Sequence, residues 1–501
     1  MSSQPALFEV AEGADGVGSP RRIRGGKRFI AIPGRDQMAL EVRRVEDMVL
    51  ADRPVRVFDA IMDRLDYGAL EDGFVGGGRP AYAPRFLCKL LFWAAHEGIR
   101  SAREISRRLH SDLNFMWLAH EVKVDHQTLS DFRREFGAQF KALFVQTVAL
   151  GIEVGLVRFG WLAIDGTKIA AHARRGMYNE ATLKEALARV EQRIAEWLAE
   201  GERTDAEEDG ALGAARGDEL PAELQDAERL REKLLVAQAA LAQSDQKAIS
   251  LGDAEAPKQK SQDGKRPGYN GQLAVDGETG FVVAEALTDA QNDQQEFAGV
   301  AREAVSNLGR KPEAVVADKG YQSEATLDAI AEEELNAYVA QPQVQTAEGY
   351  GHEAFGYDGE RDEYLCPGGA RLTFWKLKAL RTTAYRVYRS SRTSCRVCPH
   401  QTPCLGKRKE RRRELLIPPH AALLAGMRAK MATDAGRQAL QVRKQSVEPV
   451  FGVMKSVLGL RQFLLRGIEG ARAEFRIAAI AVNLRKLVAC GACHREALCA
   501  S

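Results

Sequence analysis

The sequence contains no apolar run of the roughly 18 residues that a membrane-spanning helix needs. Its first residues, MSSQPALFEVAEGADGVGS, also lack the basic and then apolar order of a secretory signal peptide. Both absences argue against insertion into a membrane or export across it, so we expect a cytoplasmic protein. With 501 residues, 45% of them hydrophobic, the chain is long enough for a packed core and for about two to four domains.

Cysteine is also scarce, and its eight residues are not distributed as a disulfide framework. Cys88 stands alone, four cysteines lie between residues 366 and 404, and three lie between residues 490 and 499. In a reducing compartment, such clusters indicate metal ligands or unreactive thiols.

Net charge is the third property of which the sequence has little. The formal net charge is +2, which argues neither for nor against nucleic-acid binding. The distribution is more informative, because acidic residues crowd the stretch 200–228 and basic residues crowd the stretch 371–413. The basic stretch is either a phosphate-binding surface or a solvated loop, and its composition does not decide between the two.

The first 150 residues divide into a polar arm and a helical region. Residues 1–28 are rich in glycine, serine and arginine, so we predict a flexible arm over residues 1–39. Residues 40–150 are predicted to form several short helices, one of which is capped by Ser101. Short helices with basic outer faces are typical of a helix-turn-helix-like DNA reader. The alternative is a helical bundle with ordinary surface charges.

One helix of this region carries candidate DNA contacts. The segment VDHQTLSDFRREF predicts a helix whose buried stripe contains Leu129, Phe132 and Phe136. Arg133 and Arg134 are expected elsewhere on its surface, and we predict that they contact DNA.

Between residues 160 and 342 the pattern changes to alternating strands and helices. WLAIDGTKIAA predicts a strand with one acid, and GQLAVDGETGFVVAEALT predicts two strands joined at a glycine-containing turn. NDQQEFAGVAREAVSNLG predicts a helix, and PEAVVADKGY predicts a strand that ends in an acid. SEATLDAIAEEE predicts a helix capped by Ser323, and NAYVAQP predicts a closing strand. This order of elements is that of an α/β domain.

Two insertions interrupt the α/β region before its last part. Residues 180–245 contain two apolar repeats with spacings of three and four, which predicts a helical hairpin or short coiled coil. Residues 343–430 hold four of the cysteines and the basic cluster. We predict C-terminal core helices over residues 431–488 and a tail over residues 489–501. The repeats of the hairpin consist of Leu183, Leu187, Val190, Ile194 and Trp197, and of Ala227, Leu230, Leu234, Ala237 and Leu241.

Two of the predicted strands carry a carboxylate at their end. Asp165 follows the apolar residues WLAI, and Asp318 follows AVVA. A buried carboxylate needs a base or a cation as its partner, because removing its charge from water is costly. Strand ends of α/β sheets bind ligands, and two such acids can share divalent ions since Mg²⁺ takes oxygen ligands. The alternative for each acid alone is an ordinary strand-end or capping aspartate.

A third acid, Glu448, lies in the predicted helix VRKQSVEPVFGVMKSVLGL. Its spacing to Phe451 predicts a carboxylate near the core, and Pro449 is expected near the start of a helix. Basic residues flank the segment, which suits a metal ion next to DNA phosphates. The alternative is a surface glutamate paired with these bases. Together the three acids suit two-metal phosphoryl transfer, in which the carboxylates hold the ions.

Residues from about 80 to 470 resemble the DDE transposases of bacterial insertion sequences. The strongest matches are AIDGTKI, VVADKGYQS, and VEPVFGVMK followed by FLLRG. The blocks GRPAYAPRFLCKLLF, SAREISRRL and DHQTLSDFRREF resemble the helical domain that precedes the catalytic domain in this group. GYN and NDQQ resemble further family positions, to which we assign no chemistry. The resemblance implies an RNase H-like catalytic core, DNA as the substrate, a homo-oligomer on paired DNA ends, and binding of Mg²⁺ or Mn²⁺ by Asp165, Asp318 and Glu448.

The family often carries a Tyr-x2-Arg-x3-Glu-x6-Lys pattern around its glutamate. The matching positions are Gln441, Lys444, Glu448 and Lys455, so tyrosine is replaced by glutamine and arginine by lysine. A lysine meets a phosphate as a point charge and not as a bidentate fork. We predict DNA contacts for Lys444 and Lys455. The departures keep open a non-catalytic DNA-binding relic or regulator, and a third hypothesis is an RNase H-like nuclease that cuts DNA without joining strands.

The cysteine-bearing insertion carries the segments YLCPGG and SCRVCPHQTPC. One CxxC pair is present without a second, so free thiols are the alternative to a metal site. His400 could replace one thiolate. The candidate ligands of a tetrahedral structural Zn²⁺ are Cys366, Cys395, Cys398 and Cys404. The tail segment CGACHREALC also has metal-like spacing, and its candidate ligands are Cys490, Cys493, His494 and Cys499.

Overall fold

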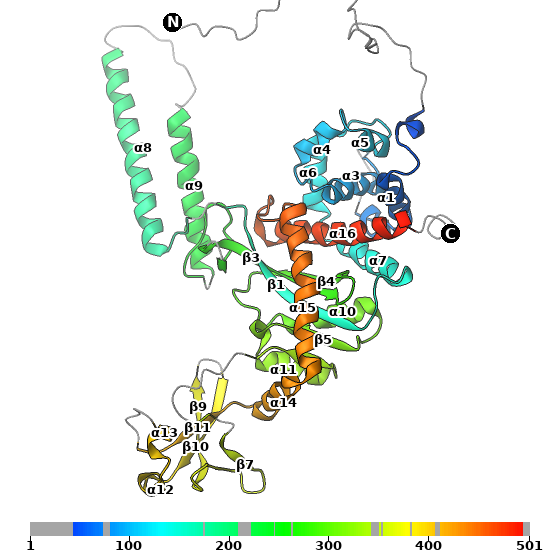
Figure 1. Ribbon diagram of the computed structural model, residues 1–501. Helices are drawn as coiled ribbons and strands as arrows, with labels where there is room; N and C mark the ends of the chain where they lie inside the picture. Colours follow the sequence, from blue (N-terminus) through cyan, green and yellow to red (C-terminus); the bar gives the residue numbers. More distant parts are fainter. Residues whose placement is uncertain are drawn as a thin grey trace, which may run out of the picture. The chain divides into compact units, whose positions relative to one another are not determined.

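The computed structural model describes residues 44–73, 81–173, 176–208, 222–244, 246–261, 264–341, 350–351, 354–380, 383–405 and 411–493 (Figure 1). The described residues from Val45 onward belong to one compact unit. The predicted arm at 1–39, residues 407–409 of the basic cluster, and His494 and Cys499 of the tail lie outside the described residues. No helix of the described part is long and apolar enough to cross a membrane.

The N-terminal part of the described chain is helical, which confirms the prediction. Ser101 caps one helix by accepting a hydrogen bond from the backbone of Glu104, which satisfies a free N–H of the first turn. Pro84 stands in the first turn of another helix, where its missing N–H leaves no bond unmade. The elements are η1 (Val45–Met48), α1 (Pro54–Asp63), α2 (Gly68–Glu71), α3 (Pro84–His96), α4 (Ala102–Arg108), α5 (Leu113–Leu118), α6 (His126–Glu135) and α7 (Phe140–Glu153).

The α/β region contains a six-stranded sheet of order β2-β3-β1-β5-β6, in which β4 also pairs with β3. β1 runs antiparallel to β3 and parallel to β5, so the sheet has an antiparallel half and a parallel half. The mixed α/β class predicted from the sequence is therefore confirmed. The strands are β1 (Trp161–Ala170), β2 (Lys258–Ser261), β3 (Gly264–Asp276), β4 (Val282–Thr288), β5 (Ala314–Ala317) and β6 (Ala337–Val339).

Helices that follow β4 in the sequence lie beside this sheet (Figure 1). α10 (Phe297–Leu308) follows β4 and ends at Gly309, whose positive φ of 68° is typical of a helix C-terminus. α11 (Glu324–Glu332) follows β5 and is capped by Ser323, as predicted. α14 (Ala421–Ala432), α15 (Asp434–Gly452) and α16 (Gly467–Cys493) complete the set. α16 packs against α1, α3 and α7 and against β4, so it joins the N-terminal helices to the sheet.

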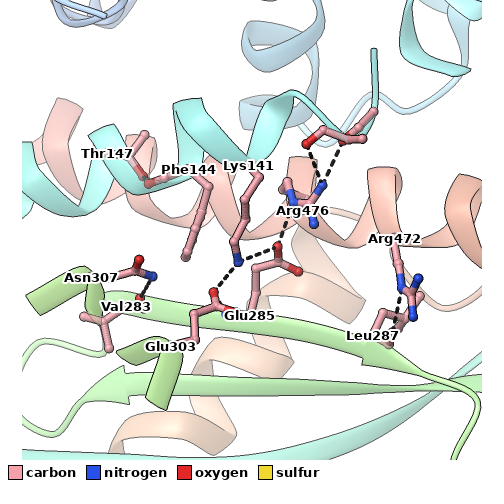
Figure 2. A network of polar contacts seen from close by, with 12 residues as sticks. Lys141, Phe144, Thr147, Val283, Glu285, Leu287, Glu303, Asn307, Arg472 and Arg476 are labelled. Carbon is pink, nitrogen blue, oxygen red and sulfur yellow. Dashed lines mark hydrogen bonds and ion pairs between the residues drawn. The ribbon is translucent and has the colours of Figure 1, made fainter. Parts of the chain in front are cut away.

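A buried ion pair fastens α16 to strand β4 (Figure 2). Arg476 of α16 donates from Nε to Oε1 of Glu285 on β4 at 2.7 Å, and the Glu285 side chain is only 1% exposed. Lys141 of α7 lies 3.5 Å from the same carboxylate and also pairs with Glu303 of α10. Burial raises the pKa of Glu285, and the two nearby cations oppose that rise. One carboxylate therefore ties two helices to one strand.

The predicted hairpin is formed by α8 (Glu180–Glu208) and α9 (Ala222–Ala242), which pack against each other. Its buried residues lie at one end and include Leu183, Leu234 and Ala237. Trp197 and Leu230 were predicted in the same seam, but they are 36% and 40% exposed. Two helices cover each apolar stripe from one side only, which explains why the rest of the seam stays open.

The cysteine-bearing segment forms a second, five-stranded antiparallel sheet of order β11-β10-β9-β8-β7. Its small core buries Phe355, Leu372, Tyr388 and Leu415. Two short helices, α12 (Arg392–Arg396) and α13 (Gln401–Leu405), lie between the last two strands along the chain. The strands are β7 (Gly356–Asp358), β8 (Glu363–Leu365), β9 (Arg371–Leu380), β10 (Thr383–Ser390) and β11 (Glu414–Ile417).

Candidate active site

Two of the three predicted carboxylates meet where the parallel pairing of β1 and β5 stops. The last pair in this register is Ile164 opposite Ala317, so Asp165 and Asp318 are the next residues on neighbouring strands. β1 continues to Ala170 because its antiparallel pairing with β3 extends further. The sequence predicts Asp165 at the end of a strand, whereas it lies inside β1. The two acids are neighbours all the same, because each follows the last residue of the β1–β5 pairing.

The Asp165 carboxylate is largely buried, with 17% of its side chain exposed. Its Oδ1 accepts a hydrogen bond from the Gly166 backbone at 2.8 Å, and its Oδ2 accepts one from Nη1 of Arg443 at 2.6 Å. Burial raises the pKa of Asp165 to about 6, against the opposing effect of the Arg443 guanidinium. The carboxylates of Asp318 and Asp293 add to the rise. Burial is therefore the main cause of the raised pKa, and the two neighbouring acids contribute less.

Asp318 leads directly from β5 into the short 3-10 helix η2 (Lys319–Tyr321). One of its oxygens, Oδ1, accepts a hydrogen bond from the Lys319 backbone at 2.6 Å. The residue is half-buried, so its carboxylate reaches solvent beside the more deeply placed Asp165.

Glu448 lies on α15, but the helix differs from the prediction. Pro449 is inside α15, near its C-terminal end, and not at a helix start. Because proline has no N–H, one hydrogen bond to the preceding turn is missing, and after α15 the chain continues as a π-helical turn, Val453–Val457. The Glu448 side chain is 47% exposed and does not point into the core. Val447 and Val450 fill the inward face instead, and Glu448 is rotated away from Val447 by about 100°.

Arg443 links two of the acids, whereas the sequence places it only among the basic residues that flank Glu448 and not among the site residues. Its Nη1 lies 2.6 Å from Asp165 and its Nη2 lies 3.5 Å from Glu448. The Arg443 side chain is 16% exposed, and its Nε is buried without a hydrogen-bond partner among the described residues. One guanidinium thus joins α15 to β1 at the acids.

The sequence contained a signal for Arg443 that the family pattern obscured. The pattern places an arginine four residues before the glutamate, and that position is Lys444 in this chain. In the structure Lys444 is exposed and Arg443 is the inward residue. Arg443 precedes the buried Val447 and Val450 by four and seven residues, which is the spacing of one helix face.

Lys455 lies in the π-helical turn and donates from Nζ to Oγ1 of Thr167 on β1. Thr167 is two residues after Asp165, so the two side chains leave the same face of the strand. A π-turn changes the direction of the residues that follow it relative to an α-helix, and such turns are frequent at functional sites. Lys455 is therefore close to the acids, and its contact with DNA stays a prediction.

A fourth carboxylate, Asp293, comes from the NDQQ motif. Its Oδ1 accepts hydrogen bonds from Nδ2 of Asn270 at 2.7 Å and Nε2 of Gln272 at 2.8 Å. Both amides are completely buried on β3. Lys168 of β1 lies 3.4 Å from the same oxygen. Tyr321 in turn donates to Oε1 of Gln272, so the motif is connected to η2.

Two glycines, one in β1 and one in η2, lie close to the Asp293 carboxylate. A Cβ at Gly166 would lie 2.8 Å from Oδ1 of Asp293 and 2.5 Å from Nε2 of Gln272. A Cβ at Gly320 would lie 3.3 Å from Oδ2 of Asp293. A side chain at position 166 would therefore force Asp293 or Gln272 to move from its present position.

The structure overturns the prediction that Arg133 is a surface residue of its helix. Arg133 is buried, with 8% exposed, and its Nη1 donates to the backbone carbonyl of Arg100 at 2.9 Å. Burial lowers the pKa of Arg133, and the nearby Glu474 opposes that shift. The Arg100 carbonyl and the Glu474 carboxylate hold the guanidinium inside the protein. Arg133 therefore supports packing and is not placed to contact DNA. Arg134 is exposed as predicted and pairs with Asp131.

The four predicted zinc ligands and His400 line one pocket of the second sheet. Sγ of Cys366 accepts a hydrogen bond from the Ala370 backbone at 3.2 Å. A Cβ at Gly368 would lie 2.6 Å from Sγ of Cys398 and 3.7 Å from that of Cys366, so the CPGG turn needs glycine there. Burial raises the pKa of the Cys404 thiol, and the other three cysteines add to the rise. The cysteines are brought together as free thiols.

The candidate metal ligands have suitable donor atoms, but their arrangement in space differs from that of a formed metal site. Oxygen donors of Asp165, Asp318 and Glu448 are the type that Mg²⁺ takes, and the cysteines are the type that Zn²⁺ takes. Across the described ranges, however, no group of three or more histidine, cysteine, aspartate or glutamate side chains is arranged to hold a metal ion. The residues fit both metals by chemistry, and both metals stay predictions.

Two protein-family models match the chain. One, described as a transposase DDE domain, matches residues 365–488, and the other, described as a transposase domain (DUF772), matches residues 43–135. The first match covers most of the second sheet, the Glu448-bearing α15 and most of α16, and the second covers the helices as far as α6. No curated protein matches the chain.

Proposed function

Because these two matches identify the chain as a DDE transposase of the insertion-sequence type, we propose that it cuts DNA strands and joins the freed 3′-hydroxyls to target DNA. Asp165, Asp318 and Glu448 are the proposed catalytic carboxylates. The observation that carries the proposal is the position of Asp165 beside Asp318 on paired strands, with Arg443 between Asp165 and Glu448.

The three carboxylates would hold Mg²⁺ or Mn²⁺. A bound divalent ion activates the attacking water or 3′-hydroxyl and stabilises the leaving oxygen. Arg443 holds Asp165 in place by a hydrogen bond and limits the repulsion between Asp165 and Glu448. Lys455, beside Thr167, puts a positive charge next to the acids, where a DNA phosphate would enter.

The order of the first sheet supports an RNase H-like core. Asp165 lies on a central strand, and the second acid, Asp318, follows the strand that is paired parallel to it. β1 has β3 and β4 on its antiparallel side and β5 and β6 on its parallel side. The helix that carries Glu448 packs on β1, β3 and β5.

DNA is the proposed partner, as the family implies. The exposed Arg134 and Lys444 and the partly exposed Lys455 are the proposed contacts from the predicted set, whereas Arg133 is withdrawn because it is buried. A homo-oligomer on paired DNA ends is proposed from the resemblance. The open apolar side chains of the α8–α9 hairpin, Trp197 and Leu230, are its candidate interface.

The proposal is tested by Mg²⁺-dependent cleavage and strand transfer on DNA that carries the ends of the element encoding this chain. Asp165→Asn, Asp318→Asn and Glu448→Gln should each bind DNA and fail to cut it. Glu332→Gln is a matched control, because this exposed glutamate of α11 pairs with Arg302 at the surface. Its activity should equal that of the wild type.

Other outcomes select among the alternatives. Binding of the ends without any cleavage, over a range of metals and pH values, would favour a DNA-binding relic or regulator. Cleavage without strand transfer would favour an RNase H-like nuclease. Cleavage by the three carboxylate variants would show that these acids are not the catalytic ones.

We also propose a structural Zn²⁺ bound by Cys366, Cys395, Cys398 and Cys404, with His400 as a possible replacement ligand. Support comes from the pocket that the four cysteines share, since four thiolates can close a tetrahedral zinc site, and from the N–H···S bond that orients Cys366. Protein purified without chelator should contain one zinc per chain, and Cys398→Ser should contain less. Absence of zinc from well-folded wild type would overturn the proposal, and Cys88→Ser is the control.

A further inference from the structure

The ribbon formed by β9 and β10 exposes aromatic and basic side chains and has no acid of its own. Residues 371–390 contain six basic residues and no aspartate or glutamate. Phe374 and Trp375 are each 43% exposed, and Leu377 is 64% exposed. Leu372 and Tyr388, at the base of the ribbon, are buried in the small core of this sheet. Phe374, Trp375 and Leu377 are not part of that core.

The position of Trp375 is set by a β-bulge and by two cations. The β9–β10 register shifts, with Phe374 opposite Tyr388 and Lys376 opposite Val387, so Trp375 is the additional residue. Cζ of Arg389 lies 3.1 Å from the Trp375 ring centroid, and Nζ of Lys376 lies 4.1 Å from it. Bulges redirect side chains in this way, and the cations fix the ring in an exposed position.

Two lysines of the ribbon have no acidic counterpart within the described ranges. Arg386 pairs with Asp362, and Arg389 pairs with Glu414. Lys376 and Lys378 are exposed on β9 and have no ion pair with any residue that the structure describes. Their uncompensated charge lies next to the exposed tryptophan ring.

From these contacts we propose that the β9–β10 ribbon is a DNA-binding arm that lies against duplex DNA. Lys376 and Lys378 would meet backbone phosphates, and Trp375 would lie against the groove. The inference rests on the proposed function, which supplies DNA as the partner. Charge of one sign favours a polyanion and opposes association with the same ribbon of a second copy. A two-stranded ribbon also fits the width of the major groove.

The test measures DNA binding by the full chain without chemistry. Fluorescence anisotropy with labelled duplex DNA of random sequence is recorded in EDTA over a range of salt concentrations. The double variant Lys376→Ala/Lys378→Ala should bind several-fold more weakly, and its slope of log affinity against log salt should fall by about two. Trp375→Ala should weaken binding with little change of slope, because it removes no charge.

A double variant elsewhere on the surface is the matched control. Lys184→Ala/Lys311→Ala removes the same charge from exposed positions on α8 and before β5, each of which already pairs with a glutamate. Its salt slope should remain within experimental error of the wild-type slope. Circular dichroism of each variant verifies the fold, and the lysine variants carry the test if Trp375→Ala unfolds.

The result that overturns the inference is an unchanged affinity and salt slope in the ribbon lysine variant. A change of oligomeric state without a change of DNA binding would overturn it too, in favour of a protein partner. Binding is measured in EDTA and cleavage is measured separately in Mg²⁺, so failure of this inference can be distinguished from failure of the proposed function. If binding depends on the ribbon but no DNA is cleaved, the DNA-binding arm stands and the proposed transposition chemistry is rejected.

Discussion

Arg443 of α15 donates a hydrogen bond of 2.6 Å to Asp165 of β1, and the same guanidinium lies 3.5 Å from Glu448. One side chain thus supplies a fixed positive charge to two of the proposed catalytic acids. Asp293 acts in the opposite sense, because its carboxylate raises the pKa of Asp165 whereas Arg443 lowers it. Substitutions of these two residues should therefore move the same titration in opposite directions.

Arg443→Gln should raise the pKa of Asp165 above its value of about 6, because the largest opposing interaction is removed. Asp165 must be ionised to hold a cation, so the acidic limb of the pH–rate profile for cleavage should move up by about one pH unit. Arg437→Gln is the control, since Arg437 is exposed on the same helix and pairs with Asp434. If the acidic limb does not move, Arg443 does not influence the ionisation of Asp165 that limits cleavage.

Asp293→Asn should shift the acidic limb to lower pH, because a negative neighbour of Asp165 is lost. The cleavage rate should also fall by about tenfold or more, since the amide no longer holds Lys168 by charge and meets two buried amide donors. DNA affinity in EDTA should be unchanged. Weaker DNA binding with an unaltered pH profile would assign Asp293 to the DNA surface and not to the acids.

Asp165→Asn should be more stable than the wild type at neutral pH in EDTA. The folded pKa of about 6 is above the ordinary aspartate value of 3.8, so between these pH values the folded state binds a proton that the unfolded state has released. Stability from this group is therefore present below about pH 4 and lost as the pH rises through 6. The variant should gain up to about 3 kcal/mol above pH 6 and nothing below pH 4.

Urea unfolding at pH 4 and pH 8 measures this difference directly. Mg²⁺ should stabilise the wild type and leave Asp165→Asn unaffected, if Asp165 holds the ion. A variant that is less stable than the wild type at pH 8 would mean that the bond from Arg443 outweighs the cost of burying the carboxylate.

Arg476→Met should destabilise the fold by about 3–5 kcal/mol, because it leaves the buried Glu285 without its closest cation. Combining it with Glu285→Gln should restore part of the loss, since the unpaired charge is then removed. Arg302→Met, which breaks surface pairs with Glu332 and Glu333, should cost about 1 kcal/mol or less. Thermal unfolding compares the four proteins, and equal losses for Arg476→Met and Arg302→Met would contradict the role of burial.

The sequence predicts elements whose cause is local. Ser101 and Ser323 cap their helices as expected, because a cap depends on neighbouring residues only. The acids Asp165 and Asp318 are recognisable because each follows a short apolar strand, and a charge after such a run is unusual. Their pairing follows from the parallel order of the strands.

The sequence is less informative where a side chain depends on a distant partner. Arg133 is adjacent to the apolar stripe of α6 and charged, so local periodicity assigns it to the surface. Its burial depends on Arg100 and Glu474, which are far away in the sequence. The inward position of Arg443 likewise depends on a distant partner, the Asp165 carboxylate on β1. Pro449 inside α15 is tolerated because the core side of that helix, at Val447 and Val450, is fully packed.

The packing of α16 has a consequence for synthesis of the chain. This helix, Gly467–Cys493, supplies buried residues such as Phe475 and Leu484 and packs on α1, α3 and α7, which leave the ribosome several hundred residues earlier. A chain that stops before residue 467 lacks the partner that covers those early helices and the cation for Glu285. Premature termination should therefore yield an aggregation-prone fragment, because the N-terminal helices depend on α16 for part of their packing.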